Sequence, residues 1–235
     1  MRTEWLFKIK EEVIKQLKVG FIKPVHQVEW IANVVPVPKK DGKVRMCVDF
    51  RELNKACPKD DFPLPHIVVL VDNMTGSALM SFMDGFLGYN QIKMVSKDMT
   101  KTTFTTEWGI HCYTVMPFGL KNVGATYQRM ATALLHDMMH NEVEAYVDDM
   151  IVKSKDEGSH TINLRKFFES IKEYKLKLNP QKCTFGVIAG KLLGFLVSDR
   201  GIEVVPFKMK AILEMPPPKS VKEIMGSLGQ LQYIS

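Results

Sequence analysis

The chain has 235 residues, of which 46% are hydrophobic and 25% charged, and 32 Lys and Arg against 26 Asp and Glu give a formal net charge of +6. This composition is typical of a globular protein with one sizeable core or two coupled lobes, and the charge favours an acidic partner such as nucleic acid. The sequence lacks an apolar run of the roughly 18 to 20 residues that span a bilayer and lacks an N-terminal signal peptide, so we expect no membrane association. It also has no CxxC pair. We therefore expect no disulfide framework and four reduced, mostly buried thiols.

In the N-terminal half, helical and strand patterns alternate. Apolar residues ahead of a glycine share one face of a predicted helix: Leu6, Ile9, Val13 and Leu17. Residues 30–50 are typical of two strands around a Lys-Lys-Asp-Gly-Lys turn, because Asp-Gly is a strong hairpin signal. Prolines predict an irregular segment over 55–67. An apolar strand over 78–83 stops at Asp84, and residues 101–119 are rich in strand-forming types.

The C-terminal half contains two long helical patterns. The first begins after Asn122, a favourable N-cap, and its apolar residues recur at spacings of three and four: Val123, Tyr127, Met130, Leu134 and Met138. The second has its own apolar face: Leu164, Phe167, Phe168, Ile171 and Tyr174. Residues 191–205 are typical of a hairpin, and Ser220 and Glu223 have capping-box spacing at the start of a last helix. Interleaved helices and hairpins predict an α+β fold with a mostly antiparallel sheet.

Two adjacent aspartates, Asp148 and Asp149, lie between residues that favour strands. They fall where a two-residue hairpin loop is expected, and Asp tolerates the positive φ that such loops require. One interpretation is a solvated turn. The other is that a doubly charged cation lies between the two carboxylates and offsets their repulsion.

Asp84 adds a third carboxylate at the end of an apolar strand. Two strands of one antiparallel sheet would bring Asp84 beside Asp148, and three carboxylates without countercharge raise one another's pKa and weaken the fold. Two Mg²⁺ ions resolve this conflict, because Mg²⁺ prefers hard oxygen ligands. Such a pair of ions assists an in-line displacement at phosphorus. The alternative for Asp84 alone is a turn or capping residue.

Cationic side chains gather in and beside the predicted hairpin turn: Lys39, Lys40, Lys43 and Arg45. Arg binds phosphate with two parallel hydrogen bonds and Lys acts as a point charge, so this turn suits a triphosphate; a solvated basic turn is the alternative. Gly119 and Gly124 flank Lys121 and permit close approach of the backbone to a ligand. His111 and Cys112 have no second ligand pair, which argues against a zinc site.

An ordered series of segments extends over nearly the whole chain: "VPVPKKDGKVRMCVDFRELNKACPKDDFPLPHI", "SFMDGFLGYNQIKM", "KTTFTTEWG", "VMPFGLKNVGATYQRM", "AYVDDMIVKS", "LNPQKCTFG" and "LLGFLVSDRGIEV". This series resembles the reverse transcriptase of plant gypsy-type long-terminal-repeat retrotransposons and, more distantly, that of retroviruses. The chain departs from the family pattern at four positions, none of them catalytic: Glu107, Val123, Val205 and Phe207.

The resemblance implies a right-hand polymerase fold with an antiparallel palm sheet. We expect residues 1–235 to be one reverse transcriptase domain, with these parts: fingers 1–60 and 92–120, palm 61–91 and 121–205, and the start of a truncated thumb at 206–235. The rest of a Pol polyprotein, with ribonuclease H, integrase and protease, is the implied context, in the cytoplasm within a retrotransposon particle or in the nucleus.

The resemblance also implies roles for individual residues. Asp84, Asp148 and Asp149 match the palm aspartates that hold two Mg²⁺ ions, for which Mn²⁺ can substitute. Residues expected to bind the deoxynucleoside triphosphate are Lys39, Lys40, Arg45, Tyr89, Phe118, Gly119 and Lys121, with Tyr89 as the steric gate against a ribose 2′-hydroxyl. Residues expected to hold the primer are Tyr146, Leu193 and Gly194.

These matches imply an RNA-directed DNA polymerase that extends a primer on an RNA or DNA template. Two alternatives stay open from the sequence. The first is a catalytically silent relic of such a polymerase that binds primer–template with strong salt dependence but adds no nucleotide. The second is another palm-like two-metal enzyme, such as a nucleotide cyclase, which the fingers motif disfavours.

Overall fold

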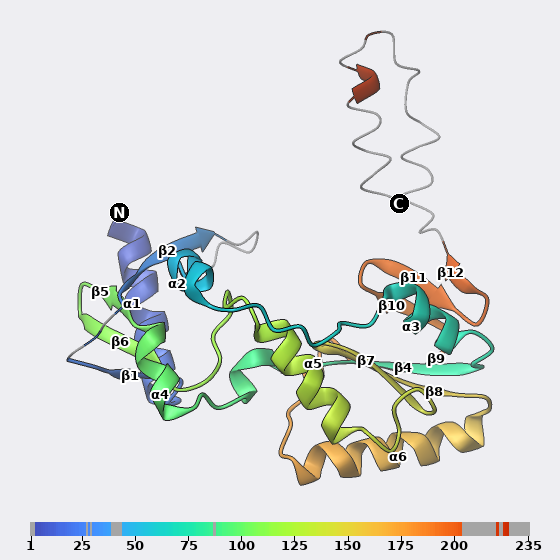
Figure 1. The fold of residues 1–235 in the computed structure, drawn as a ribbon. Helices are drawn as coiled ribbons and strands as arrows, with labels where there is room; N and C mark the ends of the chain where they lie inside the picture. Colours follow the sequence, from blue (N-terminus) through green and yellow to red (C-terminus); the bar gives the residue numbers. More distant parts are fainter. Residues whose placement is uncertain are drawn as a thin grey trace.

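The computed structural model describes residues 3–26, 28, 30–38, 44–86, 88–203, 220 and 223–225. These residues form two lobes that lie side by side, with the N-terminal elements in one lobe and the long helix α6 in the other (Figure 1). The chain passes between the lobes several times, so neither lobe is one continuous stretch of sequence.

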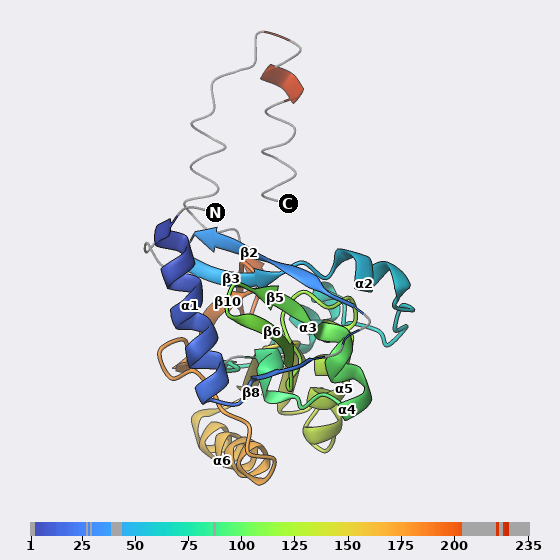
Figure 2. The same ribbon diagram turned by 90° about the vertical axis from the view of Figure 1, so that its left-hand side faces the viewer.

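The first lobe is built on a five-stranded sheet in the order β1-β6-β5-β2-β3, in which β2 and β5 pair in parallel and the other pairs are antiparallel. Helix α1 lies against this sheet (Figure 2), because its apolar face, including Ile9 and Val13, packs on Ile22 and Phe104. The elements of the lobe are α1 (Thr3–Lys18), β1 (Ile22–Pro24), β2 (Ala32–Pro38), β3 (Val44–Val48), α2 (Arg51–Ala56), α4 (Ser96–Met99), η2 (Thr100–Thr102), β5 (Phe104–Thr106) and β6 (Gly109–Tyr113).

The second lobe is built on a four-stranded antiparallel sheet in the order β7-β8-β4-β9 and a three-stranded sheet in the order β10-β11-β12. Its elements are α3 (Ile67–Met74), β4 (Leu79–Asp84), η1 (Gly88–Gln91), α5 (Val123–Leu134), β7 (Val143–Tyr146), β8 (Asp149–Ser154), α6 (Glu157–Glu173), β9 (Thr184–Val187), β10 (Ala189–Leu192), β11 (Phe195–Ser198) and β12 (Gly201–Glu203).

The four-stranded sheet is covered on both faces, with α6 on one side and α3 and β10–β12 on the other (Figure 1). Successive residues of β8 serve the two sides in turn: Met150 and Val152 pack in the cluster that contains Phe167 of α6, and Ile151 packs with Leu70 of α3. This alternation follows from the period of two in a strand. The two inner strands, β8 and β4, are therefore held on both faces and both edges.

The structure confirms the α+β fold and most of the predicted elements, with three corrections. The run Ile67–Met74, for which no helix was predicted, forms α3. The helix that begins after Asn122 ends at Leu134 and does not reach Met138. Asn122 does occupy the N-cap position, but its side chain caps nothing and instead donates to the Pro58 carbonyl oxygen at 2.8 Å.

The structure also tests the expectations for the cysteines and for the residues near Ser220. All four cysteines are free, but only Cys112 is fully buried, so the expectation of mostly buried thiols was wrong. The hydroxyl of Ser220 accepts a hydrogen bond from the backbone N–H of Glu223, as the capping-box spacing predicted. The Lys39–Lys43 turn, Leu87, and most of the segment after Glu203 lie outside the described residues. No helix within the described residues is long and apolar enough to cross a bilayer.

Candidate active site

Strand pairing brings the predicted carboxylates together at one end of the four-stranded sheet. In the antiparallel pair of β4 and β8, Asp84 lies directly opposite Asp149. Asp148 precedes Asp149 in the loop, and its backbone carbonyl accepts a hydrogen bond of 3.1 Å from the N–H of Gly85. Two segments separated by some 60 residues in the chain thus share one corner of the lobe.

The hairpin loop lies one residue earlier than the sequence predicted. Tyr146 of β7 pairs with Asp149 of β8, so the two loop residues are Val147 and Asp148. The residue with positive φ is Val147, at 51°. This conformation is unfavourable for a β-branched residue, which is why an aspartate was expected to adopt it. Asp149 belongs to β8, where its backbone is fixed by pairing with Tyr146 on one side and Asp84 on the other.

A buried glutamine of α5 holds this loop. The side-chain oxygen of Gln128 accepts a 2.7 Å hydrogen bond from the N–H of Val147, and its Nε2 donates to the carbonyl oxygen of Ala145 at 2.9 Å. Gln128 is fully buried, so these bonds form away from water and orient the hairpin strongly. Sequence reasoning missed Gln128. The available signal was a polar residue beside Tyr127, on a helix whose neighbours are mostly core.

The carboxylate of Asp148 is partly buried and lies close against Gly88. A methyl group added at Gly88, where φ is +36°, would lie 2.6 Å from Oδ2 of Asp148 and 2.7 Å from Oδ1. The Oδ1 atom is buried and has no hydrogen-bond partner among the described residues. Burial, followed by the charges of Asp84 and Asp149, raises the pKa of Asp148 to about 6.

Asp149 lies in the same environment, and Lys182 provides a positive charge next to Asp84. Burial and the charge of Asp84 raise the pKa of Asp149. The ammonium of Lys182 lies 2.9 Å from one oxygen of Asp84 and 3.2 Å from the other. Lys182 was part of the "LNPQKCTFG" segment, but sequence reasoning gave it no role.

The donor set suits a hard divalent cation, although a three-ligand centre is not preformed. No group of three or more His, Cys, Asp or Glu side chains that could hold a metal ion occurs in the described ranges. Mg²⁺, however, takes only one or two protein carboxylates and completes its shell with water and phosphate oxygens. The buried, unpartnered Oδ1 of Asp148 next to the Asp84 and Asp149 carboxylates is such a partial set.

Three aromatic rings line the corner next to Asp148. The ring of Tyr89 lies 5.8 Å from that of Phe118 and 5.7 Å, edge to face, from that of Tyr127. Burial and the charge of Asp148 raise the pKa of Tyr89. Phe118 is 69% exposed, so the series runs from the buried Tyr127 to an open edge. These rings form an aromatic surface beside the carboxylates.

The sequence model of the family described as reverse transcriptase (RNA-dependent DNA polymerase) matches residues 37–207. The chain belongs to the reverse transcriptase family. It is 34% identical over 230 residues to the retrovirus-related Pol polyprotein from transposon opus of Drosophila melanogaster, and 29% identical over 226 residues to the transposon Tf2-3 polyprotein of Schizosaccharomyces pombe. These alignments cover 96% of the chain but 23% and 17% of the two polyproteins, so this reverse transcriptase domain spans less than a quarter of their length.

Solved structures show the same fold. One match is a foamy viral protease–reverse transcriptase in complex with double-stranded DNA, with a TM-score of 0.86 at 24% identity. The match covers 99% of this chain and 40% of the viral chain. The same viral enzyme in complex with an RNA/DNA hybrid gives a TM-score of 0.85 at 23% identity, over 99% of this chain and 31% of that one. The arrangement of helices and mostly antiparallel sheets is thus that of a right-hand polymerase.

Of the remaining residues expected to bind nucleotide, the described ones lie in the first lobe and in the connection to α5. Arg45 is exposed on β3, opposite Val37 of β2, and Lys39 and Lys40 lie outside the described residues. The ammonium of Lys121 donates to the carbonyl oxygen of Cys57 at 2.8 Å, which ties the connection to the end of α2. Gly119 has a φ of 100°, and its carbonyl oxygen accepts from the side chain of Asn54. Their roles in nucleotide binding stay predictions.

The residues expected to hold a primer gather around the second sheet of the lobe. Leu193 and Gly194 form the two-residue loop between β10 and β11, with φ values of 50° and 87°, as a tight hairpin turn requires. Tyr146 packs on the same hydrophobic cluster as Leu192 and Phe195. This hairpin is therefore attached through the core to the strand that leads into the aspartate loop.

A buried ion pair fixes the other end of the β7–β8 hairpin. The ammonium of Lys153 lies 2.8 Å from Oε1 of Glu144, and both side chains are almost fully buried. Lys153 also donates to the carbonyl oxygens of Asn73 and His140, at 2.6 and 3.1 Å. With these bonds the charged pair is well satisfied, which a buried ion pair requires if it is not to destabilise the fold.

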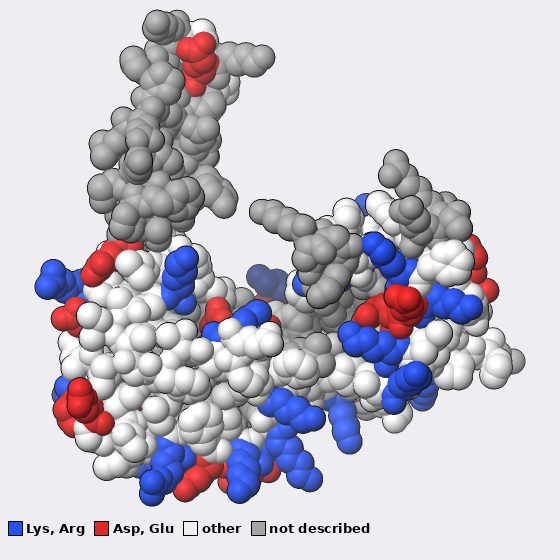
Figure 3. All heavy atoms as spheres, turned by 180° about the vertical axis from the view of Figure 1, so that it is seen from behind, with Lys and Arg blue, Asp and Glu red and all other residues white. Residues whose placement is uncertain are grey.

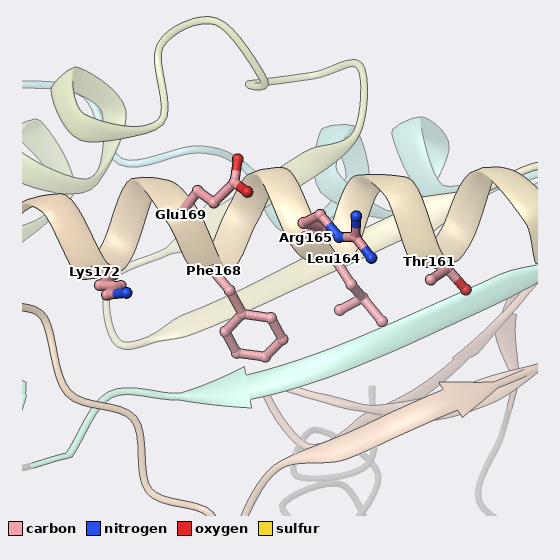
Figure 4. A pocket seen from close by; sticks show the side chains of 6 residues that line it. All are labelled: Thr161, Leu164, Arg165, Phe168, Glu169 and Lys172. Atoms are coloured by element: carbon pink, nitrogen blue, oxygen red, sulfur yellow. The ribbon is translucent and has the colours of Figure 1, made fainter.

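Two cavities lie apart from the aspartates. One, of about 370 Å³, opens on α6 between residues that include Leu164 and Phe168 (Figure 4); the ring of Phe168 points away from the helix and lies 6.3 Å from that of Phe185. The other, of about 420 Å³, lies between α1 and the first sheet, beside Trp108. Neither contains the carboxylates that carry the candidate chemistry.

Charge on the surface is mixed. On the face shown in Figure 3, Lys and Arg side chains gather along the lower edge and over the first lobe, with acidic side chains among them. Such a surface provides cationic contacts at intervals and does not form one continuous basic stripe.

Proposed function

We propose that this reverse transcriptase domain is an RNA-directed DNA polymerase of a gypsy-type retrotransposon of plants. It adds deoxynucleotides to a primer 3′-hydroxyl with release of pyrophosphate, copying element RNA into DNA. The observation that carries the proposal is the convergence of Asp84, Asp148 and Asp149 at one end of β4 and β8. Membership of the family supports the same reaction.

In this proposal, Asp84 and Asp148 hold two Mg²⁺ ions, or Mn²⁺, with help from Asp149. Bound to these carboxylates, the ions would supply positive charge at the attacking primer oxygen and at the departing pyrophosphate. The protein positions the reactants around this point, which is most of what phosphoryl-type transfer demands. Gln128 keeps the aspartate loop in place from below.

The incoming nucleotide lies between the aspartates and the fingers. The ring of Tyr89, beside Asp148 and against Phe118, crowds the ribose 2′-position and selects deoxynucleotides. Arg45 and the lysines of the adjoining turn bind the triphosphate, because a guanidinium grips phosphate with two parallel bonds. Gly119 and Lys121 shape the floor of this site.

The larger arrangement is proposed from the same resemblance. Residues 1–60 and 92–120 act as fingers, 61–91 and 121–205 as palm, and 206–235 begin the thumb. The primer end rests on Tyr146, Leu193 and Gly194.

The partners are RNA or DNA template with its primer, deoxynucleoside triphosphates, and the ribonuclease H, integrase and protease of a Pol polyprotein. The place of action is a cytoplasmic particle or the nucleus. In the solved relatives, double-stranded DNA and an RNA/DNA hybrid are the bound nucleic acids.

The test is primer extension on an RNA template with Mg²⁺ or Mn²⁺. Asp148→Asn removes one charge from the site and abolishes extension, while circular dichroism and thermal unfolding show that the fold survives. Asp137→Asn is the matched control, because the Asp137 side chain is 99% exposed; it extends primers as the wild type does. Extension that survives Asp148→Asn contradicts the assignment. Salt-dependent binding of primer–template without any extension by the wild type identifies a silent relic.

A further inference from the structure

In the described structure, the cation of Lys182 pairs with Asp84, one of the three aspartates. Its ammonium bonds to both oxygens of Asp84, at 2.9 and 3.2 Å. Its charge also lowers the pKa of Asp148 and of Asp149, against the rise that burial and the neighbouring carboxylates cause. One lysine thus offsets part of the repulsion within the whole group.

The position of Lys182 is built by backbone pairing. The segment before it docks on the end of β4: Leu178 forms an antiparallel bridge with Gly85, and the N–H of Asn179 donates to the carbonyl oxygen of Asp84 at 2.9 Å. The N–H of Lys182 then closes a turn on the carbonyl oxygen of Asn179 at 3.0 Å. The turn that carries the lysine is therefore fixed to the same residue whose carboxylate the lysine neutralises.

The side chain itself is free to leave. Lys182 is 63% exposed and Asp84 22% exposed, and ion pairs of this exposure contribute little to stability because water screens them and the long side chain loses freedom. A divalent cation carries twice the charge of an ammonium and can contact several carboxylates at once. The two kinds of cation compete for the same oxygens of Asp84.

We propose that Lys182 is a built-in countercation of the aspartate site, which holds Asp84 in place without metal and exchanges with the divalent cation when it binds. The inference deepens the proposed function and rests on it for the identity of the site. Lys182 is a positioning residue here, because it acts through Asp84. The consequence is that metal binding must displace an ion pair, which weakens apparent metal affinity.

The test measures Mn²⁺ binding directly, without nucleic acid or nucleotide. Free Mn²⁺ is followed by electron paramagnetic resonance, and thermal unfolding is recorded with EDTA and with Mn²⁺. For Lys182→Met we expect Mn²⁺ to bind severalfold more tightly, the midpoint in EDTA to fall, and the rise in midpoint on adding Mn²⁺ to be larger than in the wild type. Lys182→Arg keeps the charge and returns the Mn²⁺ affinity towards the wild-type value.

Lys166→Met is the matched control. Lys166 forms an ion pair of similar exposure with Glu142, at 53% and 25%, so its loss removes the same charge and the same kind of contact. Its Mn²⁺ affinity stays that of the wild type. Unchanged Mn²⁺ affinity in Lys182→Met, or equal tightening in both lysine variants, overturns the inference.

The outcome is separable from that of the proposed function. A wild-type protein that extends primers, together with a Lys182→Met variant of unchanged Mn²⁺ affinity, refutes the countercation alone. Tighter Mn²⁺ binding by Lys182→Met in a protein that never extends primers leaves the countercation standing and refutes the polymerase. If Lys182→Met does not fold, Lys182→Arg and Lys182→Gln are compared in the same titration, and equal Mn²⁺ affinities overturn the inference.

Discussion

The backbone N–H of Val147 lies 2.7 Å from the side-chain oxygen of Gln128. This bond joins the helix α5 to the loop that presents Asp148, and it holds Val147 at a φ of 51°. The position of Asp148, which we propose to be catalytic, thus depends on a side chain that touches no substrate in the proposed mechanism.

Replacing Gln128 should show this dependence. Gln128→Leu keeps a similar volume but removes the partner of the half-buried N–H of Val147 and of the buried carbonyl oxygen of Ala145, at a cost of about 1–3 kcal/mol in the free energy of unfolding. Because the loop also loses its orientation, we expect primer extension to fall by a factor of about 100. Urea unfolding and single-turnover extension measure the two effects. Gln181→Leu, at an exposed position, should change neither, and full activity in Gln128→Leu would refute the positioning role.

A substitution at Val147 should stabilise the protein. Asparagine adopts positive φ more readily than a β-branched residue, so Val147→Asn should raise the free energy of unfolding by about 1 kcal/mol, measured in urea. Val187→Asn is the control, because Val187 is similarly half-buried but lies in the extended backbone of β9. It has no strain to relieve and should be neutral or destabilised. A loss of stability in Val147→Asn would show that the valine side chain contributes more than the strain costs.

Gly88 should be required beside Asp148. Gly88→Ala places a methyl group 2.6 Å from the carboxylate and must push it aside, so we expect weaker Mn²⁺ binding and extension lowered by a factor of about 100. Gly76→Ala separates this clash from backbone strain, because Gly76 also has positive φ, +78°, but nothing within 4 Å of the added methyl group. Both variants should lose stability in urea, and only Gly88→Ala should lose Mn²⁺ binding. Equal Mn²⁺ affinities would exclude the clash.

The raised pKa of Asp148 should appear in the stability of the metal-free protein. The folded-state pKa, about 6, lies above the ordinary 3.8, so the folded state holds this proton more tightly than the unfolded chain does. The resulting stability is fully present below about pH 4 and is lost as the pH rises through 6. Because Asp148 is only partly buried and water screens its charge, this shift corresponds to a change on the order of 1–2 kcal/mol.

The comparison of wild type with Asp148→Asn isolates that change. Other aspartates, such as Asp60 and Asp156, have lowered pKa values and lose stability in the opposite direction, as the pH falls. Urea unfolding in EDTA between pH 4 and 7 should therefore show Asp148→Asn gaining on the wild type as the pH rises. Parallel curves for the two proteins would show that Asp148 titrates normally.

The sequence predicted the strands and helices that carry the aspartates, because their patterns are local. Alternating residues in β8 and the three-and-four spacing in α5 determine which faces are buried. The strand that ends at Asp84 was predicted for the same reason. Family resemblance then supplied the roles that spacing cannot give.

The missed features all depend on contacts between distant segments. Ile67–Met74 is rich in residues that favour strands, and it forms α3 because Leu70, Val71 and Met74 pack on the sheet. The positive φ of Val147 depends on Gln128, and the place of Lys182 depends on a turn docked on β4 nearly a hundred residues earlier. Nothing in the local patterns at these positions indicates such partners.

The buried pair of Glu144 and Lys153 has a consequence for how the hairpin assembles. A slip of one residue between β7 and β8 would turn every side chain to the opposite face and would leave two charges in an apolar interior without their partners. A misaligned hairpin is therefore destabilised at the end that lies away from the aspartates. The pairing of Tyr146 with Asp149, which sets the two-residue loop that presents Asp148, thus depends on a pair of charged residues outside the aspartate corner.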